Sequence, residues 1–497
     1  MPEPDYIPLY TAAQVRELDR LAIETHGIPG YQLMCRAGQA LADGIARHWP
    51  AARRINVWCG PGNNGGDGYV VARLLQAAGS EVRVLSLSDP DRLRGDAAQA
   101  VQDFRAQGGQ CTSFTSGLDA GAVDLHVDAL LGTGLDRPVE GAIRSAIEAL
   151  NAQSAPVLTV DIPSGLHADS GRVLGEAVQA QHTLTFIGRK RGLYTGAGVR
   201  CAGQVGFDDL GVPADICQEL VADTLLVEQP AMGPLAVARA IDAHKGDFGH
   251  VLVVGGERGM SGAARLAAEA AARCGAGLVS VATRAEHAAG LNAGCPELMV
   301  HAVTGVADLQ PLLARASVVV VGPGLGQGDW SRHLFESVLD SGLPLVVDAD
   351  ALNLLARDPC QRDNWILTPH PGEAGRLLGR TAREVGEDRF AALRQLVERY
   401  RGVAVLKGAG TLTMTGGEPV HLCARGNPGM ASGGMGDVLS GVLAALLAQG
   451  LDGFEAASAG VFLHASAADL AARQQGERGL LASDLLPWLR GLLNERV

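Results

Sequence analysis

A glycine-rich stretch at residues 426–441 holds the side chains best suited to chemistry on a phosphate. The glycines within Gly433–Gly436 have no Cβ, so their amides can close on a ligand oxygen. Apolar residues from Val438 onward recur at helical spacing, and the free N–H groups of a new helix favour an anion. Asp437 lies in that first turn, where it can take a proton from a hydroxyl that attacks a phosphoryl group. A helix cap, with Asp437 as a partner of the helix dipole, is the alternative interpretation.

Five short apolar runs precede other loops of this kind in the second half of the chain. Each run ends in glycine, an acidic residue, a threonine–proline turn with histidine, or lysine. The runs lie at residues 251–254, 318–321, 345–347, 365–367 and 403–406. Because they are apolar throughout, we expect them to form a large parallel sheet with its ligands at one edge.

Three residues in these loops have side chains that suit a nucleotide or its metal. The loop Lys407–Thr411 combines a cation, glycines and a hydroxyl, which suits a phosphate, although Lys407 can also cap a strand end at the surface. His370 stands between two prolines, where a substrate contact and a hydrogen bond to its own turn are equally open. Glu373 suits a water-bound Mg²⁺ and equally the start of a helix.

The first half contains a strand, a glycine loop and a helix in direct succession. Residues 55–59 are predicted as a buried strand and are followed by the loop GPGNNGGDG at 60–68. This order is typical of the phosphate-binding unit of a doubly wound fold, although the dinucleotide fingerprint GxGxxG is not met. The carbonyls of Asn63 and Asn64 can ligate a hard cation or hold a polar ring, and a plain turn is the alternative.

Two further strands of the first half end in acidic residues. Asp128 lies near the end of one apolar run, where it can also cap a helix, and Asp161 directly follows another. Beyond Arg191 we expect a closing strand pair, with Lys190 near the mouth of the pocket. In a parallel sheet three loops would converge on one crevice, namely 63–68, 128–138 and 161–165.

Composition excludes several classes of partner. With 41 basic and 54 acidic residues the formal charge is −13, which argues against nucleic acid and an anionic membrane surface. No apolar run reaches the ~18 residues that a membrane span needs, and the polar N-terminus is no signal peptide. The nine cysteines are scattered without a Cys-x-x-Cys pair, which fits a reducing cytoplasm and gives no metal or redox motif.

The length of 497 residues predicts about two to four domains. Regular patterning breaks down around Pro230 and Pro234, so we place a boundary near 225–232. The predicted domains are therefore residues 1–226 and 227–497. Both are α/β, and the 66 glycines, many of which follow apolar runs, suit ligand loops at strand ends.

The first-half motifs resemble the NAD(P)H-hydrate epimerase family over about residues 11–215. They are GPGNNGGDG, DALLGTGLDRPV and DIPSG, in this order. The resemblance implies a Rossmann-like three-layer domain that acts on NADHX and NADPHX, the hydrated forms of the reduced cofactors. It implies a potassium site at Asn64, Asp128 and Ser164. It implies substrate contacts at Asn63, Asn64, Gly65, Gly66, Asp67, Gly132, Thr133, Gly134, Leu135, Asp136, Arg137, Pro138 and Asp161.

The second half resembles the ribokinase-like superfamily and, within it, the ADP-dependent NAD(P)H-hydrate dehydratases, over about residues 240–495. Six motifs carry the resemblance, namely KGDFGHVLVVGG, VGPGLG, DADALN, TPHPGE, KGAGT and NPGMASGGMGDVLSG. It implies contacts with the hydrated cofactor at Ala263, Gly324, His370 and Asp437. It implies contacts with the adenine nucleotide at Lys407, Gly408, Ala409, Gly410, Thr411 and Gly436.

Together the motifs predict a bifunctional repair enzyme. The first domain would interconvert the R and S epimers, with Asp161 as acid/base group and K⁺ ordering the pocket. The second would dehydrate the S form with Asp437 as base, Mg²⁺, and ADP as co-substrate. Two alternatives remain open, a vitamin kinase and a first domain that only binds a partner. Fused α/β enzymes of this kind commonly assemble, so we expect a homo-oligomer.

Overall fold

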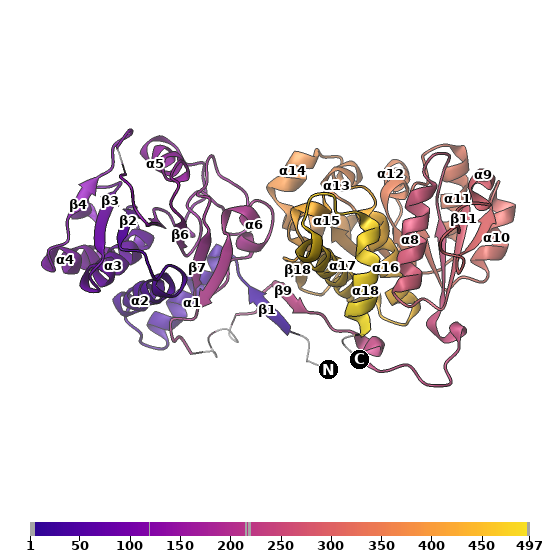
Figure 1. Ribbon diagram of the computed structural model, residues 1–497, viewed down its shortest axis with the longest axis horizontal. Coiled ribbons are helices and arrows are strands. Elements are labelled where there is room, and N and C mark those ends of the chain that lie inside the picture. The colour runs from indigo at the N-terminus through magenta and orange to yellow at the C-terminus, as the bar shows by residue number, and fades with distance from the viewer. Residues whose placement is uncertain (1–4, 119, 214–215, 217–219, 495–497) are drawn as a thin grey trace. The chain divides into compact units, whose positions relative to one another are not determined.

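The computed structural model describes residues 5–118, 120–213, 216 and 220–494. The chain divides into two compact units (Figure 1), one of residues 8–224 and one that starts at Leu225 and also includes the chain up to Ile7. The strand β9 (Thr224–Gln229) spans the predicted boundary of 226/227, and β1 (Asp5–Leu9) lies in the second sheet, not the first.

The first unit is built on a seven-stranded parallel sheet in the order β4-β3-β2-β5-β6-β7-β8. The strands are β2 (Arg54–Cys59), β3 (Glu81–Ser86), β4 (Cys111–Ser113), β5 (Leu125–Ala129), β6 (Val157–Val160), β7 (His182–Phe186) and β8 (Gln204–Asp208). The strand order reverses between β2 and β5. In doubly wound sheets the carboxyl ends of the strands at such a reversal are where ligands bind.

Helices cover both faces of this sheet, as alternate residues of β2 show. Ile55 and Val57 pack into a buried cluster with α1–α4, whereas Trp58 packs into a second cluster with α5. The helices are α1 (Ala12–Glu24), α2 (Gly30–His48), α3 (Asn63–Ala77), α4 (Gly95–Ala106), α5 (Gly141–Asn151) and α6 (Gly198–Cys201). This arrangement confirms the predicted Rossmann-like three-layer fold.

The segment after Lys190 differs from its prediction. It forms a short 3₁₀ turn at Arg191–Tyr194, the helix α6 and the single strand β8, which pairs in parallel with β7. The predicted closing strand pair is therefore wrong. The glycines here bring backbones together, since a Cβ on Gly198 would lie 1.8 Å from the carbonyl oxygen of Gly192.

The second unit holds an 11-stranded mixed sheet in the order β1-β9-β18-β17-β16-β15-β14-β13-β10-β11-β12. Its further strands are β10 (His250–Val254), β11 (Leu278–Thr283), β12 (Met299–Ala302), β13 (Val318–Val321), β14 (Leu345–Val347), β15 (Trp365–Leu367), β16 (Val403–Leu406), β17 (Thr411–Met414) and β18 (Val420–Cys423). All five predicted strands are present and parallel. The sheet is not parallel throughout, because the short loop between β16 and β17 permits only antiparallel pairing.

The helices of this unit follow the ribokinase-like α/β pattern predicted from the sequence. They are α8 (Ser261–Arg273), α9 (Ala285–Ala288), α10 (Val306–Leu313), α11 (Asp329–Asp340), α12 (Ala349–Arg357), α13 (Pro371–Leu378), α14 (Ala382–Glu387), α15 (Arg389–Tyr400), α16 (Met435–Ala448), α17 (Gly453–Gln475) and α18 (Leu485–Asn494). The alanine-rich α8 lets α16 approach closely, since a Cβ on Gly441 would lie 2.0 Å from the Ala267 carbonyl oxygen. Among the described residues no helix has both the length and the low polarity needed to cross a bilayer.

The loop after β2 yields a test of packing in the first unit. A Cβ on Gly60 would lie 1.7 Å from the Leu130 carbonyl oxygen, whereas one on Gly62 would meet nothing within 4 Å. Gly60→Ala should destabilise the unit by about 1–3 kcal/mol through overpacking. Gly62→Ala is the matched control and should leave the thermal unfolding midpoint unchanged. Equal midpoints for both variants would show that the two loops do not meet as described.

Candidate active sites

In the first unit the loop 60–68, which contains Asn63 and Asn64, lies against the loop after β5. The backbone N–H of Gly60 donates to the Ala129 carbonyl oxygen at 3.0 Å, and α3 begins three residues later at Asn63. A Cβ on Gly132 would lie 3.3 Å from Oδ1 of Asn64. The structure therefore brings the two predicted substrate loops together at the reversal of strand order.

Two of the three predicted potassium ligands, Asp128 and Ser164, are hydrogen-bonded to each other, and the Asp128 carboxylate is buried. Oδ1 of Asp128 accepts from the Ser164 hydroxyl at 2.6 Å and from Leu130 N at 3.2 Å. Oδ2 accepts from Ser164 N at 3.0 Å and from the Thr159 hydroxyl at 3.1 Å. Burial raises the pKa of Asp128, and these hydrogen bonds oppose that rise. All four donors are neutral, so they leave the negative charge in place.

The chemistry of this donor set fits a monovalent cation better than a divalent one. Among the described residues no three His, Cys, Asp or Glu side chains are placed to hold a metal ion. What the loops offer is one carboxylate, the Ser164 hydroxyl and the Asn64 amide, whose buried Nδ2 finds no hydrogen-bond partner within the part of the chain that the structure describes. Amide oxygen and nitrogen exchange places by a simple flip, so Asn64 can present oxygen instead.

Asp161 follows β6 directly and is fixed by a buried lysine. Its backbone is left-handed, with φ of 65°, and its Oδ1 accepts from the Thr185 hydroxyl at 3.1 Å and from Phe186 N at 3.2 Å. The same oxygen pairs with the ammonium of Lys190, which is only 1% exposed. The expectation that Lys190 lies at the pocket mouth is therefore wrong, because the ion pair draws its side chain inside.

Two more carboxyl groups belong to this cluster. Burial raises the pKa of Asp67 well above its usual range, and the charges of Asp161 and Asp19 raise it further while Lys190 opposes. Burial also raises the pKa of Asp19 to about 6. Asp19 lies on α1 and was not predicted as a site residue, because nothing distinguishes it from the polar positions of an amphipathic helix.

The rest of the loop after β5 is open to solvent. Asp136, Arg137 and Pro138 are exposed, whereas Leu135 packs partly against the Trp58 cluster. Of the predicted contacts at Thr133–Pro138, Thr133 and Leu135 are therefore partly buried and the others are exposed.

In the second unit the central feature is a buried ion pair between two strand ends. Asp348 follows β14, is only 2% exposed, and accepts from Lys407 Nζ and the Thr368 hydroxyl, both at 2.8 Å. The Ser440 hydroxyl on α16 donates to its other oxygen at 3.0 Å. Burial opposes ionisation of this carboxyl, but Lys407 holds the pKa of Asp348 below its ordinary value. Asp348 stands within the DADALN motif but had been given no role.

Lys407 connects the nucleotide loop to the glycine-rich turn. Its ammonium also lies 3.8 Å from Oε2 of Glu373, and a Cβ on Gly436 would lie 3.2 Å from Nζ. The side chain is only 19% exposed, so the alternative of a surface strand cap does not apply. Because Gly436 has no Cβ, the Lys407 ammonium can lie close to the start of α16.

Two carboxyl groups near Lys407 bind protons more tightly than usual. Burial raises the pKa of Asp437 to about 7, with the charge of Asp348 adding and that of Lys407 opposing. Burial likewise raises the pKa of Glu373 to about 7. A carboxyl group with such a pKa is suited to accept a proton from a hydroxyl at neutral pH.

An arginine that lies outside all the sequence motifs donates hydrogen bonds to the loop Lys407–Thr411 and to the strand before it. Arg389 begins α15, is buried, and donates to the carbonyl oxygens of Leu406, Lys407 and Gly410 at 3.1–3.3 Å. Burial lowers the pKa of Arg389 to about 10. Gly408 has φ of 137°, and a Cβ there would lie 2.6 Å from this guanidinium. Sequence spacing gave no signal for Arg389, since only the fold brings it under the loop.

His370, Ala263 and Gly324 complete the predicted set. His370 caps α13, where its Nδ1 accepts from Gly372 N at 2.9 Å and its own N donates to Glu373 at 2.8 Å. The hydrogen bond to its own turn is thus present, and the ring remains half exposed. A Cβ on Gly324 would lie 3.2 Å from that of Ala263, so these two positions adjoin each other.

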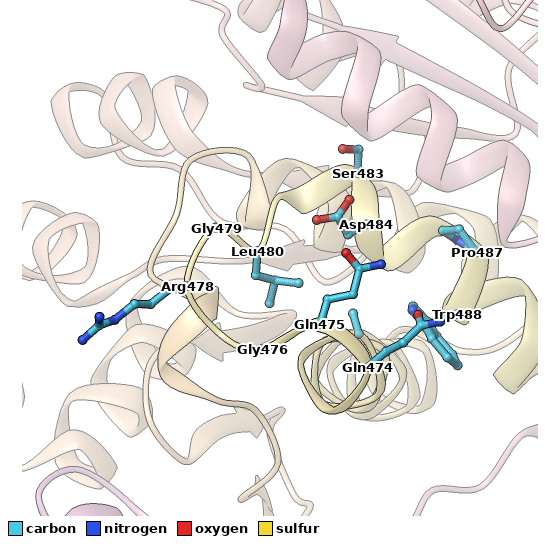
Figure 2. A pocket seen from close by; sticks show the side chains of 11 residues that line it. Gln474, Gln475, Gly476, Arg478, Gly479, Leu480, Ser483, Asp484, Pro487 and Trp488 are labelled. Carbon is cyan, nitrogen blue, oxygen red and sulfur yellow. The ribbon is translucent and has the colours of Figure 1, made fainter.

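A separate pocket adjoins the segment that Ser432 of the glycine-rich loop contacts. Figure 2 shows this pocket of 320 Å³, lined among others by Gln474, Arg478, Asp484 and Trp488. None of the predicted site residues lines it. The Ser432 hydroxyl donates to the carbonyl oxygen of Leu480, a lining residue, at 3.0 Å, so this segment supports the loop.

Comparisons with known proteins cover both units. Residues 30–192 match the family model described as YjeF-related protein N-terminus, and residues 251–489 match that described as NAD(P)H-hydrate dehydratase. A bifunctional NAD(P)H-hydrate repair enzyme of Coxiella burnetii is 51% identical over 486 residues, which are 98% of this chain and 99% of the relative. The chain belongs to the family of bifunctional NAD(P)H-hydrate repair enzymes.

Solved structures match a little over half of this repair-enzyme chain. A ribokinase-like superfamily protein from Enterococcus faecalis is 26% identical, with a TM-score of 0.50, and the match covers 56% of this chain and 98% of that one. An ADP/ATP-dependent NAD(P)H-hydrate dehydratase of Bacillus subtilis, co-crystallised with ATP and Mg²⁺, is 27% identical, with a TM-score of 0.49 and coverage of 54% and 98%.

The buried pair gives a stability prediction for the second unit of the repair enzyme. Asp348→Asn leaves the Lys407 ammonium buried without its partner, and we expect a loss of about 3–5 kcal/mol in the free energy of unfolding. Asp329→Asn is the matched control, because Asp329 pairs with Arg332 at 3.3 Å on the surface, with its side chain 86% exposed. It should cost no more than about 1 kcal/mol in urea unfolding. Equal losses would contradict the role given to Asp348.

Proposed function

We propose that this chain repairs hydrated reduced nicotinamide cofactors in two steps. The first unit epimerises the R and S forms of NADHX and NADPHX, and the second dehydrates the S form to NADH or NADPH. Family membership across both units supports this function. The observation that carries it is a proton-accepting carboxyl group, Asp437, in the first turn of a glycine-started helix beside Lys407.

Loss of water needs a better leaving group than hydroxide, and the second unit can supply one. Asp437 takes the proton of the ring hydroxyl, whose oxygen attacks the terminal phosphorus of ADP, and AMP leaves. The amides of Gly433–Gly436 and the Lys407 ammonium stabilise the charge that develops. The C–O bond then breaks with help from the ring nitrogen lone pair, phosphate departs, and the neighbouring carbon loses a proton to form the C=C bond.

The nucleotide and Mg²⁺ have places in this scheme. Lys407, Gly408, Ala409, Gly410, Thr411 and Gly436 would contact the adenine nucleotide, and Ala263, Gly324 and His370 the hydrated cofactor. Since the described residues form no metal-binding cluster of three acids, cysteines or histidines, Mg²⁺ would bind chiefly to phosphate oxygens, with Glu373 holding it through water. When bound, Mg²⁺ neutralises charge on the phosphates that react.

The first unit has the groups that an epimerisation requires. Asn63–Asp67 and Gly132–Pro138 would enclose the substrate, with Asp161 as the acid/base group at its hydroxyl-bearing carbon. K⁺ would be held by Asn64, Asp128 and Ser164, where it would balance the Asp128 charge and order the two loops. The buried Asp161–Lys190 pair favours catalysis over protein docking, because charged residues are depleted at the centre of docking surfaces.

We also propose a cytoplasmic location and a homo-oligomeric assembly. The eight cysteines in the described part of the chain are all free thiols, which suits a reducing compartment. We propose the homo-oligomer because fused α/β enzymes of this kind commonly assemble.

The elevated pKa of Asp437, about 7, predicts the pH dependence of dehydration. Asp437 is a base only when ionised, so kcat/KM should fall about tenfold per pH unit below neutrality and level off above it. Asp350 adds to the negative charge that raises this pKa, so Asp350→Asn should move the fall to lower pH. The ADP phosphates titrate in the same way with wild type and with Asp350→Asn, so their effect cancels when the two pH profiles are compared. Superimposable profiles would exclude Asp437 as the titrating base.

The products distinguish a dehydratase from a vitamin kinase. Phosphorus NMR of a complete reaction should show AMP and inorganic phosphate in equal amounts, with no phosphate left on the cofactor. Asp437→Ala should release neither and should retain epimerase activity, which is the control for folding. A lasting phosphoester made from ATP would establish the kinase instead.

A further inference from the structure

The loop that leads into α16 needs support from outside to hold its amides in place. It runs from the end of β18 at Cys423 to the start of α16 at Met435, and its residues 424–434 include four glycines and the 3₁₀ turn Pro428–Met430. Glycine backbone adopts many conformations, so the loop sequence alone does not fix where the N–H groups point. Amides stabilise a developing charge well only when they are oriented before the reaction.

The helix α17 is a firm element beside this loop. Every residue from Ala456 to Ala468 is buried, and α16 packs against α17. A helix enclosed in this way cannot shift without repacking the core around it. A side chain that extends from α17 to the loop therefore ties the loop to a fixed position.

Asp469 of α17 is such a side chain, and both of its carboxylate oxygens bind the start of the loop. Oδ2 accepts from Gly426 N at 3.0 Å, and Oδ1 accepts from Asn427 Nδ2 at 2.9 Å. One helical turn earlier, the Cβ of Ala465 would lie 3.9 Å from a Cβ on Gly426, so the loop starts close to the helix surface. Hydrogen bonds to a carboxylate are stronger than those between neutral groups.

Asn427 extends this support to the next part of the loop. Its Oδ1 accepts from Gly429 N at 3.0 Å, which caps the 3₁₀ turn. At the far end of the loop the buried His464, also on α17, forms a hydrogen bond with the backbone of Met435. The same helix therefore holds the loop at its beginning and at its end.

We propose that Asp469 is a positioning residue of the dehydratase reaction, which acts through Asn427 to orient the Gly433–Gly436 amides toward the reacting phosphate. This inference rests on the proposed dehydratase function of the second unit. Asp469 itself would touch neither the nucleotide nor the hydrated cofactor. Its effect would pass through the backbone of the loop.

The two side chains permit a reciprocal exchange that tests this role. Asp469→Asn alone turns an amide NH₂ toward one of the two donors, and Asn427→Asp alone sets a second carboxylate against Asp469. In the double variant Asn427→Asp/Asp469→Asn every hydrogen bond can form again. The new amide at position 469 accepts from Gly426 N and donates to the new carboxylate at position 427, which still accepts from Gly429 N. The double variant also has the net charge of wild type.

Dehydration of the S hydrate of NADH with ADP, followed by dihydronicotinamide absorbance in the full-length chain, is the readout. Each single variant should lower kcat at least about tenfold with KM for ADP changed by less than about threefold, because the amides act on charge that develops in the transition state. The double variant should return kcat to within about threefold of wild type. Asp329→Asn, which is exposed on α11, is the control and should match wild type.

Hydrogen exchange followed by mass spectrometry reports the loop without reference to activity. Peptides from residues 424–436 should exchange faster in each single variant and regain protection in the double variant. Peptides from β13 and β14 should exchange as in wild type throughout, which shows that the second sheet is folded.

The two readouts separate this proposal from the proposed function. If the exchange pattern is as expected but wild type does not dehydrate the hydrate, the proposed function falls. If wild type dehydrates and both single variants keep its kcat, Asp469 has only a structural role and the proposal is overturned. A double variant no faster than the single variants would also overturn it, because Asp469 would then not act through Asn427.

Discussion

Both candidate sites depend on a lysine buried against an aspartate at the carboxyl end of a parallel strand. In the second unit the Asp348–Lys407 pair joins the ends of β14 and β16 to the start of α16, because Ser440 of that helix also donates to Asp348. Breaking such a pair costs several kcal/mol, so it fixes the position of the ammonium. Burial raises the pKa of Asp437, and the two members of the pair act on it in opposite directions, since Asp348 raises it further and Lys407 lowers it.

The first unit contains a similar buried lysine–aspartate pair in a different sheet. Asp161 follows β6 as Asp348 follows β14, and each carboxylate is held by a lysine from the loop after a strand further along the chain. In both units further carboxyl groups lie near the lysine and, through burial, have raised pKa values. In each unit one ammonium lies among several carboxyl groups and pairs directly with one of them. Carboxyl groups in such surroundings suit proton transfer in epimerisation and proton abstraction in dehydration.

The sequence predicted what depends on local order and missed what depends on tertiary approach. The glycine turn with Asp437, and Asp161 at a strand end, were predictable because strand, loop and helix follow one another directly. Arg389 and Asp19 were not, because they lie in ordinary helices and reach the sites only through packing. Lys190 was recognised but misplaced, since nothing local shows that Asp161 would draw it inside. The glycines after Arg191 suggested strands, yet they serve close contacts in a 3₁₀ turn and a short helix. The pairing of β1 with β9 is likewise a contact between distant segments that periodicity does not reveal.

The central claim is that two buried charge sites in one chain act in sequence on one damaged cofactor. The most direct measurement follows the return of dihydronicotinamide absorbance from a mixed R/S hydrate of NADH, with ADP, Mg²⁺ and K⁺. Wild type should recover the whole signal, whereas Asp161→Ala should recover the S fraction promptly and the R fraction only slowly. Absence of recovery by wild type with either ADP or ATP, or full and prompt recovery by Asp161→Ala, would contradict the account.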